Sequence, residues 1–479
     1  MNKLCFLLVC WAFLCPVSKS QTLTQTQMRE DINFLQSHIN EYCSFVPLLE
    51  QRTGISVNDE YNKLKKKVTG VNSVEEFVEI IRQGLNILSD GHTGLQNSQR
   101  IKWYVANSYL SPLSNVSLAD TLHADYYYSL ENDSIYSRMK CGFWPKYING
   151  KYYIFRSFAY NGVPIKAGAE IKAVDGVAIN RFIQEHRSQL YRPMWDTVNK
   201  QWFDEYFIFA MPLMGKNKFS LTFDNQLIDF DSAKSFDNLQ SLHPQNNSSK
   251  MSILNNNILY IYMPSMMDAN WYINELLRIY TPNVKKIVID IRSNSGGDDS
   301  VWAKLLRKIL DKPLTYSYSV GVNHTVALEK AISSFGNIKV TGNAAVLTNN
   351  VTLFPDSNSV HFKGRIYVLQ NRYTYSAASA LSSLAMQSRN MQLIGEPSAL
   401  ISGYTFPAIL FKLPNSGIVF SLAFSSDLTG GKANPYMDKV NVNLELNINE
   451  HIDKVQNNDY HSDNYLMNKD KLIQYVKTH

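Results

Sequence analysis

Ser376 lies at the point where a strand-like run of residues gives way to a helix-forming run. Residues 364–370, GRIYVLQ, are rich in β-branched and aromatic side chains, and residues 377–381, AASAL, are small and favour a helix. A serine at such a corner can cap the helix, because its oxygen accepts a free N–H of the first turn. It can also act as a nucleophile, because the same N–H groups can stabilise an oxyanion. Other parts of the chain must distinguish these two roles.

Acyl transfer by a serine also needs a base and donors for the oxyanion. Gly296 and Gly297 lie in a loop after the strand-like run VKKIVIDIR, so their N–H groups are candidate donors together with that of Ala377. In a simpler interpretation the glycine pair is only a flexible connection before a helix. His92, in the turn sequence DGHT, is the candidate base, and its alternative role is that of an ordinary surface histidine.

The elements around these residues predict an α/β core. From about residue 254, strand-like and helix-like runs alternate, which indicates a mostly parallel sheet with helices. Functional groups of such sheets gather at the carboxyl ends of the strands, where the glycine loop and Ser376 both fall. Upstream, SVEEFVEIIRQGLNIL at 73–88 predicts an amphipathic helix that ends just before His92, with a capping box at Ser73 and Glu76.

The first residues, MNKLCFLLVCWAFLCPVSKSQ, have the features of a secretory signal. A lysine precedes a short apolar run, and small residues lie before Gln21. The alternative is a membrane anchor that stays uncleaved. No other stretch has the roughly 18 continuous apolar residues of a spanning helix. We therefore expect an exported protein, periplasmic or extracellular, without an integral membrane span after signal cleavage.

Charge and cysteine content exclude several other classes of protein. The net charge of +6 falls to +4 once Lys3 and Lys19 are removed, and this modest value does not predict a nucleic-acid partner. Only Cys43 and Cys141 lie outside the signal, and they could form one disulfide in an oxidising compartment. No cysteine and histidine spacing is typical of a metal site, so no metal or other cofactor is expected.

Three segments, taken together in their order, resemble the tail-specific, or C-terminal processing, serine protease family. They are VIDIRSNSGG at 288–297, LQNRYTYSAASAL at 369–381 and LIGEPS at 393–398. A fourth segment, IKAGAEIKAVDGVAI at 165–179, resembles the PDZ-like domain of that family and itself predicts the strand Glu170–Val174, a tight Asp175–Gly176 turn and a helix.

The chain departs from the Ser–Lys dyad that many members of the family use. Their lysine lies in Gly-Glu-x-Thr-x-Gly-Lys-Gly, but here GEPSALISGYTF places Ile401 near that position. A second branch, similar to the tricorn core protease and related exported bacterial enzymes, uses Ser–His–Glu with a histidine from a DGHT-like turn. Resemblance to this branch implies Ser376 as nucleophile, His92 as base and Asp438, in MDKVNVNLELNI, at the acidic position.

The resemblance also implies an architecture. We expect an α/β core of the ClpP/crotonase type, preceded by a helical domain and a PDZ-like, β-rich domain. The expected boundaries are a signal peptide at 1–20, a helical domain carrying His92 at 21–98, a PDZ-like domain at 99–250, and a catalytic core with a C-terminal helix at 251–479.

Three functions stay open on the sequence. The first is an exported serine endopeptidase that hydrolyses unfolded or C-terminal polypeptide segments by Ser–His(–Asp) acyl-enzyme chemistry. The second is a non-catalytic protein that binds peptides or other ligands on the same fold, which the missing lysine favours. The third is an esterase-like hydrolase that uses the same residues on another acyl substrate.

Overall fold

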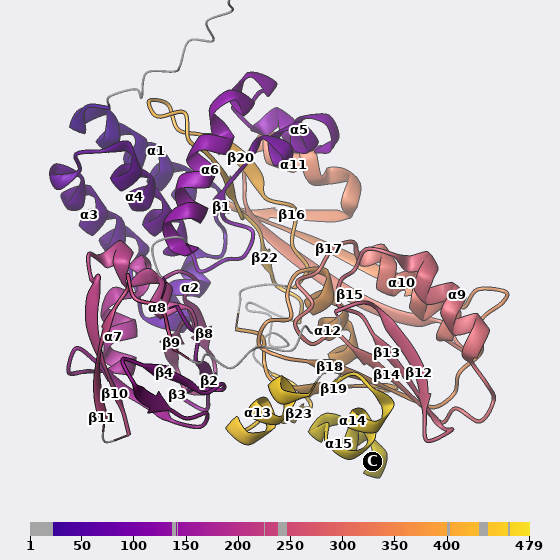
Figure 1. The fold of residues 1–479 in the computed structure, drawn as a ribbon. Helices are drawn as coiled ribbons and strands as arrows, with labels where there is room; N and C mark the ends of the chain where they lie inside the picture. The colour runs from indigo at the N-terminus through magenta and orange to yellow at the C-terminus, as the bar shows by residue number, and fades with distance from the viewer. Residues whose placement is uncertain are drawn as a thin grey trace, which may run out of the picture.

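The computed structural model describes residues 23–136, 140, 142–224, 226–237, 247–399, 403–430, 439–457 and 460–479 (Figure 1). The predicted signal at 1–20, Cys141 and Asp438 lie outside these residues. Cys43 is a buried free thiol that donates a hydrogen bond to the carbonyl of Ala423. Within the described part of the chain, every helix is too short or too polar to cross a bilayer.

The N-terminal region is helical. Its helices are α1 (Gln25–Tyr42), α2 (Val46–Thr53), α3 (Val57–Lys67), α4 (Val74–Asn86), α5 (Ser98–Asn107) and α6 (Thr121–Tyr136). The prediction of α4 is confirmed, since the Ser73 side chain accepts a hydrogen bond from the Glu76 N–H at its start. The helical region extends past the expected boundary at 98, because α6 packs against α4 and α5. The tyrosines of α6 favour a strand by propensity alone, and this packing overrides that preference.

The middle region is mostly β-structure. Its elements are β2 (Lys146–Ile148), β3 (Lys151–Tyr153), β4 (Phe158–Tyr160), β5 (Val163–Ile165), β6 (Glu170–Val174), β7 (Val177–Ala178), α7 (Ile179–His186), β8 (Met194–Asp196), β9 (Gln201–Phe203), α8 (Phe207–Ala210), β10 (Lys218–Phe223) and β11 (Gln226–Asp231). An antiparallel sheet runs in the order β11-β10-β6-β3-β2. The predicted strand, turn and helix at 170–179 are confirmed as β6, the Asp175–Gly176 turn, the short β7 and α7.

The core contains a six-stranded sheet with helices. Its strands are β12 (Lys250–Leu254), β13 (Ile258–Tyr262), β14 (Lys286–Asp290), β18 (Arg365–Gln370), β19 (Met391–Gly395) and β23 (Val442–Asn443), in that order. All neighbours are parallel except β12 and β13, which agrees with the predicted mostly parallel sheet. The helices α9 (Ala269–Ile279), α10 (Asp299–Ile309) and α12 (Ala377–Gln387) follow strands β13, β14 and β18.

The C-terminal helices cover one face of this sheet. They are α13 (Ile448–Gln456), α14 (Asp463–Asn468) and α15 (Lys471–Thr478), drawn in yellow in Figure 1. Alternate strand residues point toward them, because side chains of a strand alternate between its faces. Leu472, Ile473 and Val476 of α15 thus form a buried cluster with strand residues that include Val288 and Tyr367.

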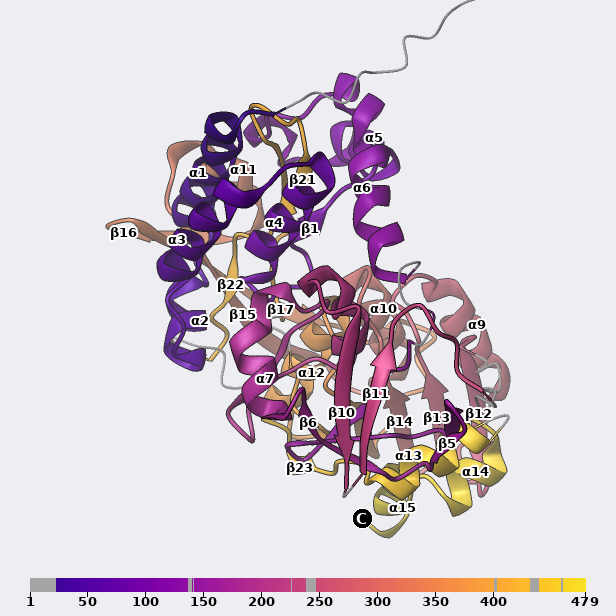
Figure 2. The same cartoon turned by 60° about the vertical axis from the view of Figure 1, so that its left-hand side comes forward.

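A strand hairpin of the core reaches into the N-terminal helical region. The hairpin is β20 (Ile409–Lys412) and β21 (Val419–Leu422), and β21 pairs with β1 (Gly94–Leu95) just after the His92 turn. Figure 2 shows β21 and β1 beside α1 and α4. A second sheet, in the order β16-β17-β15-β22, consists of β15 (Leu314–Asn323), β16 (Asn337–Thr341), β17 (Ala344–Leu353) and β22 (Ser426–Asp427), with α11 (Val326–Ile332) between β15 and β16.

Asp31 of α1 fixes the tip of this hairpin. Its carboxylate is fully buried and accepts hydrogen bonds from the backbone N–H groups of Asn415 and Ser416, at 2.8 and 2.9 Å. A buried carboxylate that accepts backbone N–H groups satisfies donors which would otherwise be left without a partner. The helical region and the core are therefore joined by a specific polar contact as well as by the pairing of β1 and β21.

We expect Asp31→Ala to destabilise the protein by about 2 kcal/mol, because it leaves the buried N–H of Ser416 and the half-buried N–H of Asn415 without an acceptor. Urea unfolding followed by tryptophan fluorescence measures this change. Asp229→Ala, which removes an exposed carboxylate from β11, is the control and should change stability by less than about 0.5 kcal/mol. Equal effects of the two substitutions would show that the Asp31 contact does not stabilise the fold.

Candidate active site

Ser376 occupies a strained corner between β18 and α12. Its backbone has φ 54° and ψ −129°, a conformation that non-glycine residues rarely adopt, and its side chain makes no capping hydrogen bond to α12. The corner is held by its neighbours, since Tyr375 N–H donates to the Asn294 carbonyl at 3.0 Å and the Thr374 hydroxyl donates to the Ile291 carbonyl at 3.0 Å. A serine on a tight strand-to-helix turn is the geometry of a nucleophile elbow.

His92 lies beside this serine, although 284 positions separate the two residues. The His92 Nε2 atom is 3.2 Å from Ser376 Oγ. The chain at and just after His92 is held by β21 and the residue that follows it, because the Ser421 hydroxyl donates to the His92 carbonyl at 2.6 Å and Ala423 N–H donates to the Thr93 hydroxyl at 3.1 Å. The sequence-predicted base and nucleophile are thus within hydrogen-bond reach of each other.

Two further side chains lie on the other side of the imidazole. The Tyr375 hydroxyl oxygen is 2.8 Å from His92 Nδ1, and this hydroxyl donates to Asp90 Oδ2 at 3.0 Å. Asp90 also accepts the backbone N–H of His92 at 2.7 Å, and burial raises the pKa of its carboxyl. Sequence analysis assigned neither residue to this network. Their closeness in the sequence to the candidate base and nucleophile could have indicated them, because Asp90 precedes His92 by two residues and Tyr375 directly precedes Ser376.

The three backbone N–H groups that were expected to bind an oxyanion differ in whether they already donate a hydrogen bond within the protein. Gly296 N–H already donates to Asn294 Oδ1 at 2.7 Å. Among the described residues, no acceptor is hydrogen-bonded to the N–H groups of Gly297 and Ala377, and the second of these begins α12. Gly297 and Ala377 are therefore better candidates for oxyanion donors than Gly296.

Gly296 instead permits a close approach of the loop to the serine corner. It has φ +102°, and a Cβ atom at this position would lie 2.6 Å from Ser376 Cβ and 3.0 Å from Ala377 N. Both the positive φ and the short distances require glycine. The loop after β14 is thus packed directly against the turn after β18, at the adjacent carboxyl ends of two parallel strands.

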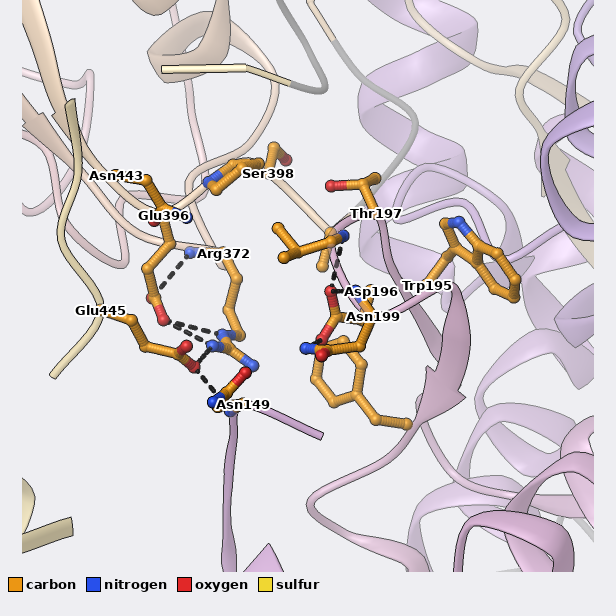
Figure 3. A pocket seen from close by; sticks show the side chains of 14 residues that line it. Asn149, Trp195, Asp196, Thr197, Asn199, Arg372, Glu396, Ser398, Asn443 and Glu445 are labelled. Carbon is orange, nitrogen blue, oxygen red and sulfur yellow. Dashed lines mark hydrogen bonds and ion pairs between the residues drawn. The ribbon is translucent and has the colours of Figure 1, made fainter. Parts of the chain in front are cut away.

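A polar pocket of about 250 Å³ lies between the middle region and the core, and Trp195, Arg372 and Glu396 are among the residues that line it (Figure 3). Arg372, four residues before Ser376, is bound in it by Glu396 and Glu445 of the core. The same guanidinium donates to the Tyr147 carbonyl at 3.1 Å and lies over the Tyr147 ring, so it also contacts the middle region. Burial raises the pKa of Glu445, which the positive charge of Arg372 opposes. Arg372 thus links the middle region to the segment that carries the serine.

Comparison with known proteins identifies the core. Residues 257–432 match the model of Peptidase family S41, and this range contains the three core motifs described above, so the family to which they pointed is confirmed. No curated protein matches the chain in sequence.

Solved structures share the fold at low sequence identity. Mature CPAF complexed with lactacystin is 12% identical, with a TM-score of 0.57 over 95% of this chain and 98% of that one. The CPAF s499a mutant is also 12% identical, with a TM-score of 0.53 over 95% and 97% of the two chains. The photosystem II D1 C-terminal processing protease is 14% identical, with a TM-score of 0.38 over 88% of this chain and 94% of that one.

We expect Gly296→Ala to lower the reactivity of Ser376 about 100-fold, because the added methyl group displaces the serine corner. The rate of covalent labelling by a fluorophosphonate probe measures this. Gly176→Ala is the matched control, since Gly176 also has positive φ but a Cβ there meets no atom within 4 Å. Unchanged labelling of Gly296→Ala would show that the close approach does not position the serine.

Proposed function

Because residues 257–432 form a core of peptidase family S41, we propose that the chain is a serine endopeptidase that hydrolyses peptide bonds through an acyl-enzyme on Ser376. The observation that carries this proposal is the distance of 3.2 Å between His92 Nε2 and Ser376 Oγ. A histidine at this distance can act as the general base that the missing family lysine does not supply.

In the proposed mechanism, Ser376 Oγ attacks the carbonyl carbon of a peptide bond while His92 Nε2 accepts its proton. The N–H groups of Gly297 and Ala377 donate to the oxyanion, and the second lies at the positive end of the α12 dipole. The intermediate collapses by breaking the C–N bond, and His92 transfers its proton to the leaving amine. Water, deprotonated by His92, then attacks the acyl-enzyme, and Ser376 regains its proton as the ester bond breaks.

We further propose that the middle region is a PDZ-like domain that binds unfolded or C-terminal segments of substrates. Its antiparallel sheet, with α7 packed against β6, supports this role. Such a domain binds an extended peptide by adding it as a strand to a sheet edge and by capturing its terminal carboxylate. The N-terminal sequence supports export, so the proposed substrates are polypeptides in the periplasm or outside the cell.

We expect Ser376→Ala to abolish fluorophosphonate labelling and casein cleavage, and His92→Ala to lower both rates by at least about 10⁴-fold, because each removes one group of a coupled pair. His123→Ala, which removes an exposed histidine of α6, is the control and should be active.

The substrate panel separates the three functions. Cleavage of casein or of peptides with unstructured tails, but not of short-chain esters, supports the endopeptidase. Hydrolysis of esters alone would favour the esterase-like hydrolase. Saturable binding of a peptide without labelling at Ser376 would favour the non-catalytic binding protein and overturn the proposal.

A further inference from the structure

We propose that Tyr375 and Asp90 together set the protonation state of His92, so that its Nδ1 atom carries the proton and its Nε2 atom is free to accept the proton of Ser376. This inference rests on the proposed function, because it assigns His92 the role of base. In a Ser–His–acid triad, a carboxylate accepts the Nδ1 proton of the imidazole directly. Here the Tyr375 hydroxyl lies between His92 Nδ1 and the Asp90 carboxylate.

The assignment follows from counting protons at the Tyr375 hydroxyl. This group has one hydrogen, and it donates that hydrogen to Asp90 Oδ2, which as part of a carboxylate can only accept. The same hydroxyl oxygen accepts the Gly91 N–H at 3.1 Å. The remaining neighbour, His92 Nδ1 at 2.8 Å, must then be the donor to the tyrosine oxygen. An imidazole that is neutral and protonated at Nδ1 has its lone pair on Nε2, 3.2 Å from Ser376 Oγ.

The packing around the tyrosine allows little freedom in this arrangement. Tyr375 is 5% exposed, and its ring lies so close to the DGHT turn that a Cβ on Gly91 would be 2.8 Å from Tyr375 Cε1. The ring also lies against the imidazole, with centroids 4.7 Å apart. Because Tyr375 immediately precedes the serine, one backbone segment positions both the nucleophile and the group that orients its base.

Asp90 supplies a carboxylate to this network. When His92 accepts the serine proton it becomes a cation, and Asp90 is the carboxylate connected to it through Tyr375. The Asp90 carboxylate is held in place by its bond from the His92 backbone N–H, which lies in the same turn. Tyr375 and Asp90 are therefore positioning residues: they orient the imidazole and stabilise its cationic form, and they do not touch the substrate.

Two single variants should affect the tautomer of His92 in different ways. In Tyr375→Phe, Nδ1 loses its partner, so both neutral tautomers become populated. In Asp90→Asn, the amide oxygen keeps the bond from the His92 backbone N–H, so the amide NH₂ points to the tyrosine oxygen. The tyrosine hydrogen then turns toward His92 Nδ1, which places the imidazole proton on Nε2, the wrong atom for a base.

These considerations predict an unusual order of activities. We expect Tyr375→Phe to lower kcat for a peptide about 10–100-fold and Asp90→Asn to lower it about 10³-fold or more, with KM nearly unchanged in both, because the substrate contacts remain. The double variant should be as active as Tyr375→Phe and therefore more active than Asp90→Asn alone. Two independent structural defects would instead add, and the double variant would then be the least active.

Nitrogen NMR of protein labelled with ¹⁵N-histidine gives a readout that does not depend on turnover. The His92 signal is assigned by its loss in His92→Gln. We expect the pattern of an Nδ1–H tautomer in the wild type, a mixture in Tyr375→Phe and an Nε2–H tautomer in Asp90→Asn. Tyr373→Phe, the same chemical change two residues away, is the control and should resemble the wild type in both measurements.

The outcomes separate this inference from the proposed function. An Nε2–H tautomer in the wild type, or a Tyr375→Phe variant with unchanged kcat while His92→Ala is inactive, would overturn the relay and leave the peptidase proposal intact. Full labelling and cleavage by His92→Ala would instead overturn the role of His92 itself. Should Asp90→Asn fail to fold, the tautomer and kcat of Tyr375→Phe still decide the question.

Discussion

The candidate site depends on one short pairing of strands. β1 supplies only Gly94 and Leu95, which pair with Ser421 and Phe420 of β21, yet this contact fixes the turn that carries His92. It acts together with the hydrogen bonds that join Tyr375 to Asp90 and to the Gly91 N–H, which also hold the turn beside the serine corner. The hairpin thus contributes to the geometry of the site, although no atom of it has a role in the proposed chemistry.

Strain at the serine is the second constraint. A non-glycine residue at φ 54° costs on the order of 1–3 kcal/mol, and such a conformation persists only where the surrounding contacts over-determine it. Here the contacts that hold Ser376 in this conformation come from the neighbouring loop. The Asn294 carbonyl accepts a hydrogen bond from the Tyr375 N–H, and Gly296 packs against Ser376. The glycine loop and the serine turn thus support each other across two adjacent parallel strands, which explains why both motifs occur together in the chain.

The sequence predicted the parts of this protein that depend on local pattern. The mostly parallel sheet, the strand and turn around Asp175, and helix α4 are all found as expected, because periodicity and turn residues specify them directly. Helix α6 was missed, since its tyrosine-rich sequence is helical through packing against α4 and α5. Asp90 lies close to His92 in the sequence and Gly296 was a candidate oxyanion donor, but their hydrogen bonds and close contacts depend on Tyr375 and Asn294 and on the serine corner, whose positions only the folded chain defines.

The crossing of β21 into the N-terminal region also bears on when the site can exist during synthesis. The ribosome completes the histidine turn early and the serine corner late, but the strand that joins them, residues 419–422, follows the serine by more than 40 positions. A nascent chain that ends before that strand contains Ser376 but lacks the strand that positions His92. The pairing of His92 with Ser376 therefore requires nearly the whole polypeptide, and a truncated translation product lacks the complete candidate site.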